Sequence, residues 1–163
     1  MLMQQEHNRA AGYPKAAKII CWLLTAACMC VIFWLSSRTA DESSAQSDIF
    51  VELLQRIFGD GLITEFIVRK GAHFCEYAGL GFLFALSFYI QFGKTRTPAA
   101  VLCVSAYAVT DELHQLFVDG RACRAADWAI DTAGAILGAT VLLLAVLICK
   151  KRAEARENKA IRN

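Results

Sequence analysis

The amino-acid sequence predicts an all-α fold: an integral membrane four-helix bundle with an amphipathic extracytoplasmic helix between the first and second membrane helices. Composition is the first indication, because 56% of the residues are hydrophobic and the mean hydropathy is +0.40, more apolar than an ordinary soluble domain. The second is a set of four apolar stretches of roughly 20 residues, the length that crosses a bilayer as a helix. The connections between the last three stretches are short, so consecutive helices are expected to run antiparallel.

The four membrane helices are predicted over residues 19–35, 72–92, 97–118 and 128–149. The first apolar run also fits the core of a secretory signal peptide. It continues well past Cys28, however, so a retained helix is the better interpretation. The chain then divides into a cytoplasmic N-terminal segment (1–18), a transmembrane domain (19–149) and a basic cytoplasmic tail (150–163).

An amphipathic helix is predicted between the first two membrane helices. Its apolar residues recur at helical spacing at Ile49, Phe50, Leu53, Ile57 and Phe58. Ser47 or Asp48 is the expected N-cap, residues 59–61 are expected to end the helix, and residues 36–38 and 41–44 are expected to form loops. Because the segment is too short and too charged to cross a bilayer, we expect it to lie along the membrane surface.

The distribution of basic residues predicts the orientation. With the N-terminus inside, eleven of the 17 Lys and Arg residues fall on the inner side and six on the outer side. The positive-inside rule therefore places both termini in the cytoplasm and the chain in the cytoplasmic membrane as a multi-pass protein. The basic tail is expected to attract anionic lipid. A net charge of only +2 argues against a nucleic-acid partner.

Ionisable side chains gather at the predicted outer ends of three membrane helices. They are His73, Glu76, Asp111, Glu112, His114, Gln115, Asp127 and Asp131. Helix periodicity places Asp127, Asp131, Gly134 and Gly138 on one face. Since the spacing of the two glycines is typical of closely packed membrane helices, the aspartates are expected to face the bundle interior.

Two interpretations of this cluster remain open. Buried polar side chains can lock four helices in register, with Arg121 and Arg124 near enough to pair with Asp127, Asp111 or Glu76. Alternatively the cluster is a functional pocket, because ionisable residues inside a membrane are expensive and commonly functional.

The residues of the cluster form an ordered set of motifs. These are Arg69-Lys70-xx-His73-Phe74-x-Glu76-Tyr77-xx-Leu80-Gly81, Asp111-Glu112-x-His114-Gln115-x-Phe117, Gly120-Arg121 and Asp127-xxx-Asp131-xx-Gly134-xxx-Gly138. Over about residues 36–138 the set resembles the VanZ-like family of small bacterial membrane proteins, although Asp119 stands where family members often have Pro. The founding member is associated with low-level resistance to the glycopeptide teicoplanin. The resemblance implies a role at the bacterial cell envelope, without a mechanism.

Three functional hypotheses follow. The first is an enzyme, a hydrolase or transferase, acting on a lipid-linked envelope substrate. Its candidate catalytic residues are His73, Glu76, Asp111, His114 and Asp131, with a histidine as general base. Ser36, Ser37 and Cys75 are nucleophile candidates by location alone. Glu76, Asp111, Asp127 and Asp131 offer oxygen ligands to a divalent cation, but the sequence assigns no metal site and leaves the cofactor open.

The second hypothesis is a binding protein whose partners, besides the lipid bilayer, are a lipid-linked cell-wall precursor or an amphiphilic glycopeptide. Its candidate binding residues are Lys70, Tyr77, Glu112, Gln115, Arg121, Arg124 and Asp127. The third, a transporter or proton relay, ranks last because the inner halves of the helices offer only Ser87, Ser105 and Thr140. The sequence does not fix the oligomeric state.

Overall fold

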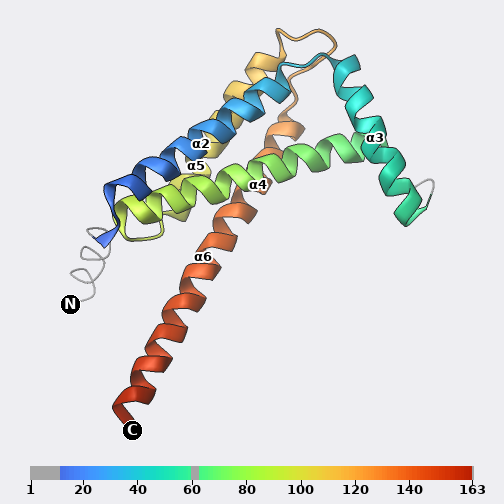
Figure 1. Ribbon diagram of the computed structural model, residues 1–163. Helices are drawn as coiled ribbons and strands as arrows, with labels where there is room; N and C mark the ends of the chain where they lie inside the picture. The colour runs from blue at the N-terminus through green and yellow to red at the C-terminus, as the bar shows by residue number, and fades with distance from the viewer. Residues whose placement is uncertain (1–11, 60–62, 163) are drawn as a thin grey trace.

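A computed structural model describes residues 12–59 and 63–162. The described residues are helical and contain no strand, which confirms the all-α prediction. The helices are α2 (Lys15–Ser36), α3 (Ala40–Phe58), α4 (Glu65–Phe92), α5 (Thr97–Gln115) and α6 (Ala125–Arg162). In Figure 1, α2, α4 and α5 lie side by side, while α6 crosses α4 and its last turns project away from the other helices.

Among the described residues, α2, α4 and α6 are long and apolar enough to cross a membrane. The chain is therefore a multi-pass membrane protein. The predicted third span, α5, is shorter than expected and ends at Gln115 instead of Val118. Polar residues in its last turns, Asp111, Glu112 and His114, lower its hydropathy, and α5 is not among the helices that are apolar enough to span by composition.

The most extensive helix pair is α4 with α6, and glycine makes its close approach possible. A Cβ added at Gly138 would fall on the backbone of Ala78, and one at Gly134 on the backbone of Phe74. In return, Gly81 of α4 lies against the backbone of Ala135. The predicted close-packing role of the two α6 glycines is thus confirmed, and the face that carries Asp131 packs inward.

Two helix starts differ from the sequence prediction. Thr39 caps α3 in a capping box with Glu42, so residues 41–44 are helical instead of forming a loop, and neither Ser47 nor Asp48 is the cap. Thr64 caps α4, so that helix begins before the predicted residue 72. His73 consequently lies in its third turn and Glu76 at the start of its fourth, instead of in its first turns.

The other helix ends can also be compared with the predicted segment boundaries. Helix α2 already begins at Lys15, and α6 runs on through the predicted tail to Arg162. Gly59, at φ 90°, ends α3 as expected. Residues 1–11 of the predicted N-terminal segment, and Asp60 and Gly61 of the predicted breaker, lie outside the described residues.

The buried core divides along the helices. One apolar cluster lies beside the buried polar residues and contains Ile32, Tyr77, Leu80, Val104, Ala108 and Ala135. The other lies toward the far ends of the same helices and contains Ala85, Ala100, Ala139, Leu142 and Val146.

Candidate functional site

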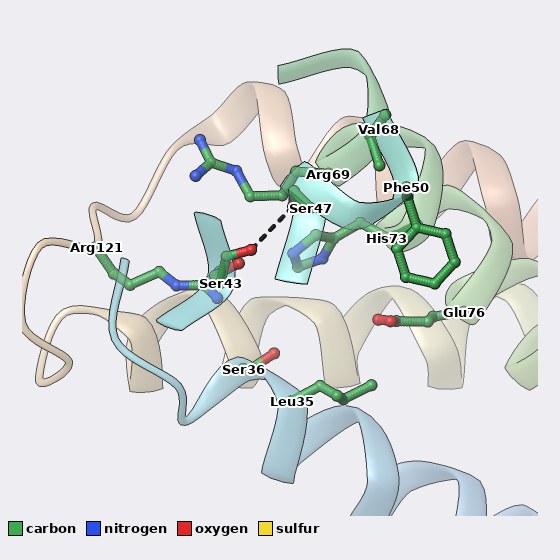
Figure 2. Close-up of a pocket in the computed structure, with 11 residues that line it drawn as sticks. Leu35, Ser36, Ser43, Ser47, Phe50, Val68, Arg69, His73, Glu76 and Arg121 are labelled. Atoms are coloured by element: carbon green, nitrogen blue, oxygen red, sulfur yellow. Dashed lines mark hydrogen bonds between the residues drawn. The ribbon is translucent and has the colours of Figure 1, made fainter. Parts of the chain in front are cut away.

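A cavity of about 300 Å³ lies where α2, α3 and α4 meet the loop before α6. Leu35, Phe50 and Val68 give it an apolar wall. Its other lining residues are mostly polar: Ser36, Ser43, Ser47, Arg69, Ala72, His73, Glu76 and Arg121. Figure 2 shows Arg121 and Glu76 entering this space from opposite sides. We call it the larger cavity.

A second cavity of about 70 Å³, here called the smaller cavity, adjoins the first. The two share Arg69, His73 and Arg121 in their linings. The smaller cavity is also lined by Lys70, Gln115, Gly120, Ala122, Arg124 and Asp127. Between them the cavities therefore gather eight of the predicted site residues around one place: Lys70, His73, Glu76, Gln115, Arg121, Arg124 and Asp127 directly, and Asp111 through its bond to Ser36.

Two aspartates are almost fully buried beside the cavities. Asp111 is 1% exposed and accepts hydrogen bonds from Ser36 Oγ at 2.8 Å and from Gln115 Nε2 at 3.2 Å. Asp131 is 0% exposed, and neither of its oxygens has a hydrogen-bond partner among the described residues. Its Oδ1 lies 3.6 Å from Nδ1 of His73. A buried carboxylate without partners is costly, so His73 and Asp131 form the pair best placed to share a proton.

The cations and anions of the site pair differently from the expectation. Asp127 forms an ion pair with Lys70, not with Arg121 or Arg124. Arg121 donates Nε–H to the carbonyl of Arg38 at 3.2 Å, and Glu112 accepts the backbone N–H of Arg124 at 2.7 Å. The predicted arginine–carboxylate pairs are thus replaced by arginines that keep most of their donors for other partners.

Five predicted site residues line neither cavity: Asp111, Asp131 and Glu112, described above, and His114 and Tyr77. The ring of His114 stacks on Phe33, with centroids 4.3 Å apart, and its Nε2 lies 3.1 Å from Ser37 Oγ. Tyr77 is buried, and its hydroxyl lies beside the carboxyl group of Asp111. His73 is therefore the histidine that the structure brings to the cavities.

Some lining residues were not predicted. Ser43, Ser47 and Phe50 follow one face of α3 at helical spacing, and Arg69 lies on α4. The apolar periodicity of α3 predicted only the face that meets the membrane, not the face that lines the cavity. The signal available was the run of small polar residues at positions i and i+4, in line with Phe50 at i+7.

Neighbouring cations repel each other at the site. Burial lowers the pKa of Arg121 below its ordinary value, and the neighbouring Arg69 lowers it further, while Asp111 and Glu112 oppose the shift. The guanidinium nonetheless stays charged. In the part of the chain that the structure describes, no group of three His, Cys, Asp or Glu residues is arranged to hold a metal ion.

Fold and site together define a helical multi-pass membrane protein with a buried polar cluster and adjoining cavities at one end of its helices. The chain belongs to the VanZ/LLP1 family, whose sequence model matches residues 21–148. The match includes every residue that lines the two cavities and confirms the resemblance given by the motifs. No curated protein and no solved structure gives a significant match to the chain.

Proposed function

We propose that this protein binds an amphiphilic molecule of the bacterial envelope, a membrane lipid or a lipid-linked cell-wall precursor, in the larger cavity. The observation that carries the proposal is the two-sided lining of this cavity. Leu35, Phe50 and Val68 offer apolar contact, and Arg121 and Glu76 offer charge. Pockets that fix a ligand commonly combine an apolar lining with a few placed polar groups.

The surface of α3 supports access from the membrane. Ile49 is 69% exposed and Ile57 is 65% exposed, and Phe66 at the start of α4 is also exposed. Exposed apolar side chains on an amphipathic helix favour a position within the membrane interface. Phe50, on the same helix, lines the cavity, so a molecule held in the lipid layer would meet the cavity without crossing water.

The proposal includes an orientation. Helices α2, α4, α5 and α6 form four spans, α5 being carried by its packing against α4 and α6, with both termini in the cytoplasm and the cavities on the extracytoplasmic side. Binding of a lipid-linked precursor in the larger cavity would reduce the precursor's encounter with a glycopeptide such as teicoplanin. This reduction would account for the low-level resistance that the family resemblance implies.

Photo-crosslinking in bacterial membranes tests the proposal. A photoreactive phenylalanine analogue replaces Phe50, and a matched control carries it at Leu102, which is 71% exposed on α5 and lines neither cavity. We expect one envelope amphiphile to be enriched at position 50 over position 102. If both positions capture the same lipids in the same proportions, there is no specific site and the proposal fails.

A second candidate function is hydrolysis or group transfer on the bound amphiphile. The 3.6 Å spacing between His73 and Asp131 favours it, because a buried carboxylate that orients a histidine produces a general base. The spacing exceeds a hydrogen bond, as is common in catalytic sites without substrate. Mass spectrometry of the crosslinked molecule separates the two functions: a chemically altered ligand with wild type and an unaltered ligand with Asp131→Asn would favour the enzyme.

A further inference from the structure

The smaller cavity is unusual in the sign of its charge. Arg69, Lys70, Arg121 and Arg124 contribute four cations to its lining, and Asp127 contributes one anion. These side chains come from the outer turns of α4 and from the loop that leads into α6, so helix packing brings together charges that repel each other. Such repulsion is disfavoured unless an anion offsets it.

Pairing within the chain offsets only part of this charge. Lys70 is neutralised by Asp127, and Arg69 has Glu65 at 3.6 Å on the same helix. Among the described residues, no carboxylate forms an ion pair with Arg121 or Arg124. Arg121 uses Nε for the Arg38 carbonyl, which leaves the two terminal nitrogens of its guanidinium.

The size of the cavity limits what can offset the remaining two charges. At about 70 Å³, the smaller cavity has less than a quarter of the volume of the larger one. That space suits a compact anion such as a single phosphate group. A phosphate monoester also carries between one and two negative charges near neutral pH. Its oxygens match the paired donors of a guanidinium.

The residues shared by the two cavities indicate where the rest of a ligand would lie. Arg69, His73 and Arg121 border both cavities, so a group in the smaller cavity continues into the larger one. There the wall formed by Phe50 and Val68 is apolar.

We infer that the ligand is a lipid phosphate, with its phosphate held in the smaller cavity by Arg121 and Arg124 and its lipid part lying along the apolar wall of the larger cavity. This inference rests on the proposed function and names the ligand class for it. Arg121 and Arg124 can bind the phosphate without first breaking an ion pair, whereas Lys70 would have to leave Asp127.

Binding to the purified full chain tests the inference. The protein is held in a neutral maltoside detergent, which carries no phosphate, and is titrated with dioctanoyl phosphatidic acid, dioctanoylglycerol and inorganic phosphate. We expect phosphatidic acid to bind best. Arg121→Gln and Arg124→Gln should each weaken it about tenfold, the usual loss for one charge-assisted hydrogen bond. The matched control is Arg56→Gln, which removes the same charge from an exposed ion pair on α3 and should leave binding unchanged.

The other outcomes overturn the inference in distinguishable ways. Equal binding of dioctanoylglycerol shows an amphiphile site without a phosphate requirement, so that the proposed function stands and the phosphate assignment fails. Equal binding of inorganic phosphate shows a free-anion site and overturns the lipid part. If neither lipid binds, the inference fails, while crosslinking at position 50 still decides the proposed function independently.

Discussion

The two ends of the helix bundle bury different kinds of residue. At the end that carries the cavities, the site end, the fully buried side chains include Asp111, Asp131, Glu112 and Gln115. At the far end, the buried residues are alanine, leucine and valine, with one hydroxyl pair between Thr25 and Ser87 at 3.0 Å. Among the described residues, the buried carboxyl and carboxamide groups lie at the site end, which favours a binding or catalytic site there over a transport route.

The two ends differ in whether their buried polar atoms have hydrogen-bond partners. The far end satisfies its buried polar atoms: Thr25 donates to the carbonyl of Cys21 and lies within hydrogen-bond distance of Ser87. The site end leaves Asp131 without a hydrogen-bond partner among the described residues, next to His73. Unsatisfied groups of this kind are rare and concentrate where a protein acts.

The largest effect on stability is expected at the glycine contact between α4 and α6. Gly138→Ala places a methyl group on the backbone of Ala78, so α4 and α6 must separate and the protein should lose about 2 kcal/mol or more of stability. Gly79→Ala is the matched control, since nothing lies within 4 Å of its Cβ. Thermal unfolding in detergent measures both. Equal melting temperatures for the two variants would mean that the glycine contact does not hold the ends together.

The next largest effect should fall on function alone. Asp131→Asn replaces a buried carboxyl group that has no hydrogen-bond partner among the described residues, so we expect folded protein at wild-type level or above, together with loss of any teicoplanin resistance. Membrane level and drug susceptibility are measured on the same cells. His73→Ala and Asp111→Asn should follow the same pattern. If all three variants vanish from the membrane, the cluster serves to hold the helices together.

The Lys70–Asp127 ion pair sharpens the comparison within the site end. Each side chain is only 14% exposed, whereas the partners in the Arg56–Glu52 pair are about 70% exposed. A double-mutant cycle with Lys70→Gln and Asp127→Asn should give a coupling above 1 kcal/mol, because breaking a partly buried pair strands a charge. The same cycle on Arg56 and Glu52 should give about 0.3–0.5 kcal/mol. Comparable couplings would show that water reaches both pairs equally.

The smallest effect is expected at the far end. Thr25→Val removes the hydroxyl that faces Ser87, and hydrogen bonds between membrane helices contribute on average about 0.6 kcal/mol. Stability should therefore fall slightly, and ligand capture should stay at the wild-type level. Loss of capture in this variant would show that the two ends are coupled, which would reopen the transport hypothesis.

Much of this arrangement was predictable from helix periodicity. The inward face of Asp131, Gly134 and Gly138 was predicted, because residues at spacings of three and four share a helix face whatever surrounds them. The gathering of His73 and Asp131 followed from that face together with antiparallel packing. These predictions succeeded since they depended on local geometry alone.

The unpredicted part depended on a helix cap whose residues resemble a loop and on contacts between distant segments. Polar residues of a helix start look like loop residues, so the capping box of Thr39 and Glu42 concealed the first turns of α3. The missed turns carry Ser43, and with it one wall of the larger cavity. Ion-pair choice was also out of reach, because whether Asp127 meets Lys70 or Arg121 depends on where the loop before α6 folds.

The length of α6 has a consequence for the electrostatic reach of the C-terminus. Its 38 residues span about 57 Å at about 1.5 Å per residue, and the hydrocarbon layer accounts for only about 30 Å. A continuous rod cannot fold its end back onto lipid headgroups. If the layer begins at the predicted start of the span, Trp128, it ends near residue 148. With a Debye length of about 8 Å, only charges within roughly five residues of that surface would then sense anionic lipid, namely those of Lys150, Lys151 and Arg152. On this placement we expect Arg156, Lys159 and Arg162 to stand in screened solvent beyond them.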